Sequence, residues 1–386
     1  MDLHLLQYRA SCMVYNNLII QTAFWFLGFF FLFRIPQPKR SAVEIRSYPS
    51  LSVIIPVRNE ESSLPILLAS LKEEVRPPDE IIVVVNAAEG ETIKVAERNN
   101  VKVLLSKPTP EGWIGKPWAC YQGAQAAKGD ILVFLDADTR LERNGLKSIL
   151  DTHFTRSGVI SVQPYHVTKK LYEQLSAFFN IILMGAMGTC TVFGNLIKPL
   201  GLFGPCIVME RECYLKFGGH EEVKGEIVED LAIGDRLKEQ KIPIYCCSGK
   251  NNISFRMYPN GIKELIDGWS KGFATGAVKT YIPVLIAIIA WVGGGISATI
   301  YSVQAIFSMN TTLILVYAAA YLGFVIQIYW MLFRIGNFKF YTALFYPICL
   351  LFFLIIFLYS IFIIFIRKTV RWKGATISLK NKGPKR

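Results

Sequence analysis

Four long apolar stretches constrain this chain more strongly than any other feature of its sequence. They are Met13–Phe33, Thr280–Phe307, Thr312–Phe333 and Tyr341–Ile366. A helix needs about 20 residues to cross roughly 30 Å of hydrocarbon, so each stretch is long enough to span a membrane. The positive mean hydropathy of the chain agrees. The sequence therefore predicts an N-terminal membrane anchor over residues 1–40, membrane helices over residues 280–366 and a basic tail over residues 367–386.

Basic residues gather beside the apolar stretches. Arg34, Lys39 and Arg40 follow the first stretch, and the tail from Arg367 onward carries eight Lys or Arg and no acidic residue. Attraction to anionic lipid headgroups explains this placement, and the net charge of +13, better than nucleic-acid binding does. Because basic flanks stay on the cytoplasmic side, we expect a multi-pass protein of the cell membrane whose central block faces the cytoplasm. The eight cysteines include no Cys-x-x-Cys pair and are expected to be reduced thiols.

The charge pattern conflicts with four full crossings. Four spans would place the basic tail on the side of the membrane opposite the central block. We therefore expect one stretch to be re-entrant or interfacial, and Thr280–Phe307 is the first suspect because Gly293-Gly294-Gly295 interrupts it. The apolar region Leu175–Leu202 is a further candidate for lying in the interface.

The central block, residues 41–279, alternates short apolar β-branched runs with amphipathic stretches. The predicted strands are Leu51–Val57, Glu80–Val85, Val101–Leu105 and Asp130–Leu135, and the predicted helices are Glu60–Glu73 and Pro117–Ala127. This alternation indicates an α/β domain with a largely parallel sheet. Ligands in such sheets gather at the carboxyl ends of strands.

Two carboxylates follow the last of these strands. Asp136 and Asp138 come directly after the apolar run Leu132–Leu135, and alternation along the strand points both side chains to the same side. Carboxylate oxygens suit Mg²⁺ or Mn²⁺, and such a metal can bridge to diphosphate oxygens. The competing interpretation of this motif is a strand that ends in an acidic turn.

Other polar residues are weaker candidates for a site when each is taken alone. Glu229-Asp230 opens a predicted helix, and one of the two could be a general base, although acidic residues are favoured in the first turn of any helix. Lys116 stands just before another predicted helix, where it could contact a phosphate or a nucleotide. His166 and His220 are possible metal or substrate contacts, but neither has a second ligand at metal-site spacing.

The order of these motifs resembles that of the family 2 glycosyltransferases of GT-A fold. The shared features are Pro56-Val57-Arg58-Asn59-Glu60-Glu61, Gly115-Lys116, Asp136-Ala137-Asp138 and Glu229-Asp230, over about Leu51 to Lys279. The resemblance implies a GT-A nucleotide-sugar-binding domain in the central block. It also implies a metal-dependent hexosyltransferase that uses Mg²⁺ or Mn²⁺.

The resemblance also implies a role for each motif. The residues expected to contact the nucleotide-sugar are Pro56, Glu60, Asn86, Lys116 and Asp136. Asp138 would bind the metal, and Asp136 would face the metal or the donor ribose. Asp230, beside Glu229, would be the catalytic base of a direct displacement with inversion at the anomeric carbon.

Two features depart from the family pattern. Family members usually carry a loop such as Asp-Asp-Gly-Ser after the second strand, where this chain has Asn86-Ala87-Ala88-Glu89, so Asn86 is the positional counterpart of the aspartate. The Gln-x-x-Arg-Trp motif of processive members is absent, and Trp269-Ser270-Lys271-Gly272-Phe273 stands in its place. Its absence implies one transfer per acceptor.

Three further segments resemble a branch of this family that esterifies a carotenoid carboxylate of the diaponeurosporenoate type with glucose from UDP-glucose. They are Ser161–His166, Phe255–Gly261 and Gly268-Trp269-Ser270-Lys271 with Ala274–Ala277. By this resemblance the donor is UDP-glucose and the acceptor a lipid. The residues expected on the acceptor side are Trp269, Arg256 and His166.

Two alternatives stay open. The acceptor could instead be a hydroxyl lipid such as diacylglycerol, ceramide or a hopanoid, or a polyprenyl phosphate, and with a hydroxyl Asp230 would be a true base. A transporter or scaffold that only binds nucleotide-sugars is a different class. It is disfavoured because the four apolar stretches contain no Asp, Glu, Lys or Arg, which a transport path would need.

Overall fold

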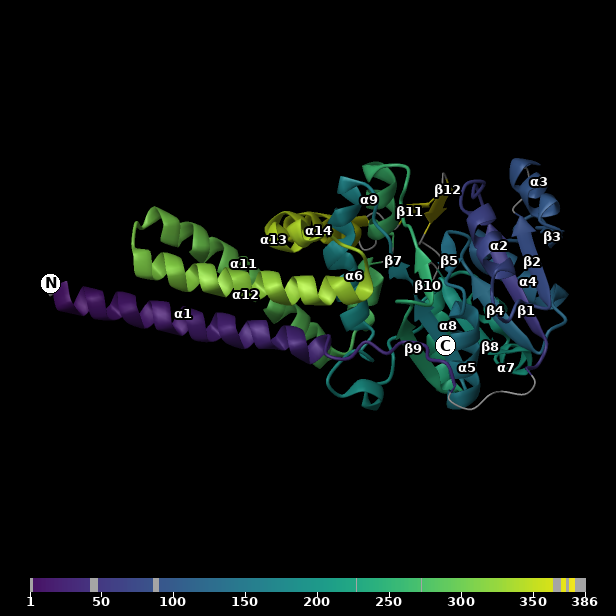
Figure 1. Cartoon of the computed structure of the whole chain (residues 1–386), viewed down its shortest axis with the longest axis horizontal. Coiled ribbons are helices and arrows are strands. Elements are labelled where there is room, and N and C mark those ends of the chain that lie inside the picture. Colours follow the sequence, from purple (N-terminus) through teal and green to yellow (C-terminus); the bar gives the residue numbers. More distant parts are fainter. Residues whose placement is uncertain are drawn as a thin grey trace.

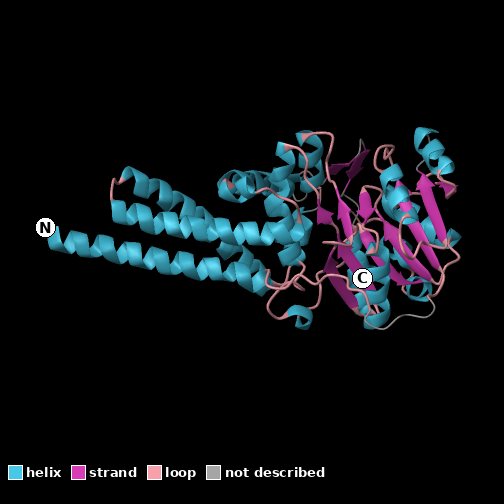
Figure 2. Cartoon of the chain, viewed as in Figure 1, coloured by secondary structure: helices cyan, strands magenta, loops and turns pink. Residues whose placement is uncertain are grey.

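The computed structural model describes residues 3–41, 48–85, 90–226, 228–271, 273–363, 369–372 and 375–378, with the backbone alone for residues 3–13, 195, 369–372 and 375–378. An α/β domain lies at one end of the molecule, and a bundle of long helices extends from it to the N-terminus (Figure 1). The described strands all belong to the domain end (Figure 2).

Seven strands form the main sheet, in the order β3-β2-β1-β4-β8-β6-β9. They are β1 (Leu51–Val57), β2 (Glu80–Val85), β3 (Lys102–Leu105), β4 (Ile131–Leu135), β6 (Val159–Gln163), β8 (Cys206–Glu210) and β9 (Ile244–Ser248). β8 runs antiparallel to its neighbours β4 and β6, and the remaining pairs are parallel. This mixed, largely parallel sheet confirms the predicted α/β domain.

Helices cover both faces of the main sheet. They are α2 (Leu64–Lys72), α3 (Gly90–Arg98), α4 (Gly115–Ala126), α5 (Gly145–Arg156), α7 (Arg211–Lys216) and α8 (Glu229–Glu239). The predicted helix from Glu60 begins instead at Leu64, because a turn precedes it and a proline occupies its first turn. The apolar core on one face of the sheet continues without a break into the helical bundle.

A smaller sheet lies between the main sheet and the bundle, in the order β5-β10-β7. Its strands are β5 (Thr139–Leu141), β7 (Tyr165–His166) and β10 (Ile253–Phe255). His166 of β7 also forms a β-bridge with Gly336, the residue that follows the last long helix. Helices α9 (Ile262–Ser270) and α10 (Phe273–Lys279) then lead from the domain to the bundle.

Three helices of the bundle are long and apolar enough to cross a membrane. They are α1 (Leu3–Phe31), α11 (Ile282–Phe307) and α12 (Thr311–Ile335), which run side by side (Figure 1). Because α11 is one uninterrupted helix, the expectation of a re-entrant segment at Thr280–Phe307 is wrong. Gly294 serves close packing, since a Cβ on it would lie 2.8 Å from the Cβ of Phe24 on α1.

The last apolar stretch, Tyr341–Ile366, does not form one long helix. It contains α13 (Phe340–Leu344) and α14 (Tyr346–Ile361), and residues 364–366 lie outside the described residues. The 16 residues of α14 rise about 24 Å, which is short of the roughly 30 Å of a hydrocarbon core. The described part of this stretch is interrupted at Phe345, before a proline in the first turn of α14, and the prediction of a full span up to Ile366 stays a prediction.

Helix α6 (Ala177–Ala186) lies inside the protein rather than on its surface. It packs against α11, α12 and α14, and most of its side chains are buried. Helix α6 therefore does not present its apolar side chains to lipid, and the expectation that Leu175–Leu202 lies in the membrane interface stays a prediction. The described part of the tail is a hairpin, β11 (Thr369–Trp372) and β12 (Ala375–Ser378), that lies beside α9 at the domain (Figure 1).

Candidate active site

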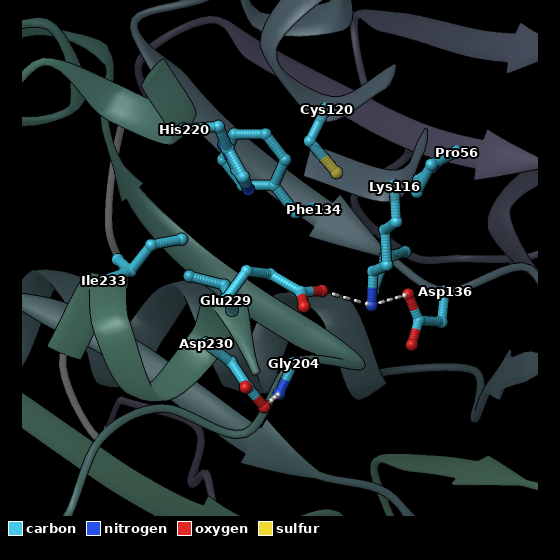
Figure 3. Close-up of a pocket in the computed structure, with 12 residues that line it drawn as sticks. Pro56, Lys116, Cys120, Phe134, Asp136, Gly204, His220, Glu229, Asp230 and Ile233 are labelled. Carbon is cyan, nitrogen blue, oxygen red and sulfur yellow. Dashed lines mark hydrogen bonds and ion pairs between the residues drawn. The ribbon is translucent and has the colours of Figure 1, made fainter. Parts of the chain in front are cut away.

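A narrow pocket lies at the carboxyl end of β4, between α4 and α8 (Figure 3). It is lined by Pro56, Lys116, Cys120, Phe134, Leu135, Asp136, Gly204, Ile207, His220, Glu229, Asp230 and Ile233. The structure thus brings together six residues that the sequence singled out: Pro56, Lys116, Asp136, His220, Glu229 and Asp230. The free space among these side chains is about 10 Å³, which is room for roughly one water molecule.

The ammonium of Lys116 contacts two carboxylates on different sides of this pocket. Its Nζ lies 2.6 Å from Oδ1 of Asp136 and 3.5 Å from Oε1 of Glu229 (Figure 3). Burial lowers the pKa of Lys116, but the charges of the two carboxylates outweigh burial and raise that pKa well above its ordinary value. Lys116 is therefore a permanent cation between the end of β4 and the start of α8.

The neighbouring carboxylates of Glu229 and Asp230 differ in their affinity for a proton. Burial raises the pKa of Glu229, but the charges of Lys116 and Lys271 outweigh burial and lower it below its ordinary value. Burial and the charge of Glu229 raise the pKa of Asp230 to about 6. A carboxylate pair whose pKa values are pushed apart is typical of acid–base sites. Asp230 is thus the member of the pair that exchanges a proton near neutral pH.

Close packing of α8 against the preceding loop fixes the position of Asp230. The backbone N–H of Gly204 donates to Oδ2 of Asp230 at 3.1 Å, and that of Leu231 donates to Oδ1 at 3.0 Å. A Cβ on Gly201 would lie 2.6 Å from Cα of Leu231, and a Cβ on Gly234 would lie 2.5 Å from Cα of Gly201. Glycines at both positions therefore let the helix approach the loop closely enough for the Gly204 amide to reach the carboxylate.

Asp136 and Asp138 occupy the turn after β4. The N–H and hydroxyl of Thr139 both donate to the backbone oxygen of Asp136, which fixes this turn. Among the described residues no group of three His, Cys, Asp or Glu side chains could hold a metal unaided. Two carboxylates nevertheless fit Mg²⁺ or Mn²⁺, because such ions take one or two protein carboxylates and complete their shell with phosphate oxygens and water.

Of the remaining residues predicted to contact the nucleotide-sugar, Glu60 does not line this pocket. Glu60 lies before α2, where its carboxylate accepts a hydrogen bond from the hydroxyl of Ser63. Asn86 lies outside the described residues. The roles predicted for both stay predictions.

The three residues predicted on the acceptor side also lie outside the pocket, and each contacts other side chains of the protein. Trp269 stacks on Phe179 with ring centroids 4.7 Å apart, and Arg256 forms an ion pair of 2.6 Å with Glu173. His166 is fully buried beside Asn180, and burial lowers its pKa to about 4. Trp269 is nevertheless connected to the turn after β4 through Tyr258. It packs edge to face on Tyr258, and burial and the negative charge of Asp138 in that turn raise the pKa of Tyr258.

Sequence reasoning assigned no role to three residues of this region. Gly204 holds Asp230, and Lys271 acts electrostatically on both acidic residues of the pair. Cys120 faces the pocket from α4 (Figure 3). The only sequence signal was the place of Lys271 in the segment Gly268–Lys271.

His220, singled out as a possible metal or substrate contact, is held neutral at physiological pH by burial, which lowers its pKa to about 4.

Comparison with known proteins gives consistent matches. The family described as Glycosyl transferase family 2 matches residues 52–195. The chain is 35% identical over 339 residues to a 4,4'-diaponeurosporenoate glycosyltransferase of Staphylococcus haemolyticus (strain JCSC1435), covering 86% of this chain and 89% of that protein. Identity to the enzyme of the same name from Staphylococcus aureus (strain USA300) is 31% over 337 residues, with the same two coverages of 86% and 89%. These matches are longer than the central block and therefore extend into the flanking helices.

Solved structures give weaker likenesses. A mannosyltransferase from Pyrobaculum calidifontis in complex with GDP-Man and Mn2+ has a TM-score of 0.49 at 14% identity, covering 83% of this chain and 98% of that chain. Glucosyl-3-phosphoglycerate synthase from Mycobacterium tuberculosis in complex with UDP has a TM-score of 0.42 at 19% identity, covering 64% and 88%.

Proposed function

Because the chain belongs to the family 2 glycosyltransferases, we propose that it transfers glucose from UDP-glucose to the carboxylate of a membrane-soluble carotenoid acid. The observation that carries this proposal is one pocket in which Lys116 joins Asp136 to Glu229, beside Asp230. The acceptor comes from relatives that are 31% and 35% identical over most of this chain and carry the name 4,4'-diaponeurosporenoate glycosyltransferase. The product is a glycosyl ester and the by-product is UDP.

The turn after β4 is the expected donor side of the pocket. Asp138, with Asp136, would hold Mg²⁺ or Mn²⁺ against the donor diphosphate, and such a metal neutralises the charge that develops on the leaving UDP. Pro56, Glu60 and Asn86 are the expected contacts of the nucleoside. Lys116 adds a permanent positive charge on this side. A hexose is larger than the free space of the pocket, so donor binding requires the partly exposed Lys116 side chain to shift.

The acceptor side of the pocket is formed by Glu229 and Asp230. In the proposed reaction an acceptor oxygen attacks the anomeric carbon as the bond from that carbon to the diphosphate breaks, which inverts its configuration. A carotenoid carboxylate is already ionised near neutral pH, so no proton has to be removed. Asp230 then orients the acceptor, and Lys271 offsets the repulsion between the carboxylates.

One observation favours a second candidate function, transfer to a hydroxyl lipid. The pKa of Asp230, raised to about 6, is suited to a general base that works near neutral pH. With a hydroxyl acceptor, Asp230 would remove the proton as the new bond forms. The two candidates therefore differ in whether Asp230 must accept a proton.

We also infer that the protein is a multi-pass membrane protein with its catalytic domain in the cytoplasm. The domain lies at the C-terminal end of α1 and again at the C-terminal end of α12, where His166 bridges to Gly336. Three crossings by α1, α11 and α12, with α14 too short to cross, put the basic tail on the same side as the domain. This removes the conflict with the positive-inside rule that four crossings would create.

The deciding experiment incubates the purified chain with UDP-glucose and Mg²⁺ or Mn²⁺. Reactions contain either a carotenoid acid or total lipid extract without it, and UDP release and lipid-linked hexose are followed by mass spectrometry. The expected result is a hexose ester formed with the carotenoid acid. A glycolipid formed instead from the extract would support the hydroxyl candidate. No UDP release with any donor, not even slow hydrolysis, would overturn the enzyme assignment.

A further inference from the structure

A second cavity, of about 440 Å³, lies where α12 meets the domain. Its lining residues are Glu142, Tyr165, Val167, Gly249, Lys250, Asn251, Ile253, Ser254 and Asn337. They come from the residue after β5, from β7 and the residue after it, from β10, from the turn between β9 and β10, and from the segment after α12. None of them lines the active-site pocket. The cavity is thus a separate feature at the base of the helical bundle.

The last turn of α12 indicates where this cavity lies relative to a membrane. The Arg334 guanidinium lies 4.5 Å from the ring centroid of Trp330, and Gly336 then bridges to the domain. A tryptophan and a basic residue at the end of an apolar helix are typical of the headgroup level. The cavity beside Asn337 therefore opens at that level, on the side of the catalytic domain.

Two cations lie at this corner, Lys250 on the cavity wall and Arg334 beside it, and their hydrogen-bond partners are neutral. Lys250 donates to the backbone oxygen of Phe333 at 2.8 Å and lies 3.6 Å from the centroid of its ring. Arg334 donates to the backbone oxygen of Phe33 at 3.1 Å. Within the described part of the chain neither forms an ion pair with a carboxylate, and Glu142 on the cavity wall is exposed. Burial and the charge of Arg334 lower the pKa of Lys250, which indicates that the two cations repel each other.

We propose that this cavity binds the phosphate of an anionic phospholipid headgroup, with Lys250 on its wall as the direct cationic contact and Arg334, the residue after Phe333, as a second positive charge nearby. The neutral partners hold the two side chains in place, and among the described residues no carboxylate pairs with either cation beside this hollow at the headgroup level. A phosphate diester supplies the missing negative charge, and the acyl chains can lie along the apolar surface of α12. The proposal rests on the proposed membrane placement of α12 and not on the identity of the sugar acceptor.

Native mass spectrometry of the full chain in detergent tests this site without relying on transferase activity. Phosphatidylglycerol is titrated against phosphatidylcholine with the same acyl chains. The expected result is saturation at one retained phosphatidylglycerol per chain. The double variant Lys250→Gln, Arg334→Gln should weaken its retention about 30-fold, because each basic residue near an anionic headgroup contributes about fivefold to binding.

Matched variants separate the site from general charge. Arg98→Gln with Lys216→Gln removes the same charge from α3 and α7, at the end of the domain opposite the bundle (Figure 1), and should leave retention unchanged, since that end lies well beyond a screening length of about 10 Å. Lys250→Arg with Arg334→Lys keeps both charges and should retain the lipid.

If the glutamine pair fails to fold, Ser254→Glu offers a second test, because it places a carboxylate in the cavity and leaves both cations in place. It should weaken retention to a similar extent. The proposal would be overturned if the glutamine pair and Ser254→Glu retained as much lipid as the distant pair, or if uptake did not saturate. Displacement of the lipid by millimolar inorganic phosphate would identify a free-phosphate site and overturn the lipid assignment. UDP-glucose hydrolysis in the same samples reports the proposed enzyme activity separately.

Discussion

The Nζ of Lys116 lies 2.6 Å from Oδ1 of Asp136, so the cation that precedes α4 is bound to the first carboxylate after β4. The same ammonium lies 3.5 Å from Glu229, and Asp230 is the next residue. Three carboxylates thus surround one permanent cation in a pocket with room for about one water molecule. The excess of negative charge suits the arrival of a divalent cation with a nucleotide diphosphate.

Replacing Lys116 by Gln should lower kcat/KM for the donor by about 10²- to 10³-fold. The substitution removes the charge that joins Asp136 to Glu229 and leaves their carboxylates to repel each other. Initial rates of UDP release over a range of UDP-glucose concentrations measure the effect. Lys107→Gln, at an exposed lysine outside the pocket, is the matched control, and an equal loss in both variants would contradict the assignment of Lys116.

The raised pKa of Asp230 predicts a pH dependence of stability. Its pKa is about 6 in the folded protein and about 3.9 in an unfolded chain, so the folded state binds this proton more tightly. The stabilising effect is complete below about pH 4 and is lost as the pH rises through about 6. As the pH rises from about 4 to above 6, the Tm of Asp230→Asn should therefore rise relative to that of the wild type. Thermal unfolding of both proteins across this pH range measures the difference. A constant difference in Tm would contradict the raised pKa.

Asp230→Asn also separates the two candidate acceptors. With a hydroxyl lipid the variant should lose about 10²- to 10⁴-fold in rate, because it cannot accept the proton. With a carotenoid acid it should stay within about tenfold of the wild type, because that acceptor is already ionised. Product formation by mass spectrometry with each acceptor gives the two rates. Asp235→Asn, on the exposed side of the same helix, should change neither.

The sequence predicted those parts of the fold that depend on local pattern. β1, β2 and β4 match the predicted strands to within one residue, because strands buried on both faces are continuous apolar runs. The glycine triplet in α11 was misinterpreted as a break, since sequence alone does not tell a helix interruption from a contact such as that of Gly294 with Phe24. The sequence likewise did not predict the interruption before α14, because the apolar composition of this stretch matches that of a full span.

The sequence predicted the residues of the site but not the contacts between them. Asp136, Lys116 and Glu229 each carried a weak signal, and their resemblance to a family pattern joined them, but no local rule says that one ammonium contacts both carboxylates. Contacts between residues far apart in sequence depend on the packing of the whole domain. The same limit applies to the ion pair of Arg256 with Glu173, which occupies a side chain predicted to face the acceptor.

Asp138→Ala should abolish turnover and metal dependence together. The substitution removes the carboxylate expected to hold the metal at the end of β4, where the described residues offer no set of three ligands to replace it. UDP release by the wild type should stop on chelation and return with Mn²⁺, whereas the variant should stay inactive at any concentration. Asp267→Ala, at an exposed position of α9, is the control. A variant with near-normal, metal-dependent rates would show that the metal is held elsewhere.

Gly201→Ala should destabilise the protein and displace Asp230. The new Cβ would lie 2.6 Å from Cα of Leu231, a backbone atom that cannot move without shifting the start of α8. Overpacking of this kind costs about 1 to 3 kcal/mol of unfolding free energy, so Tm should fall. Movement of α8 should also lengthen the bond from the Gly204 amide to Asp230 and lower kcat/KM beyond the effect on folding. Gly276→Ala, where a Cβ meets nothing within 4 Å, should keep both Tm and activity. If both alanine variants melted and turned over like the wild type, close packing of α8 would not be what positions the carboxylate.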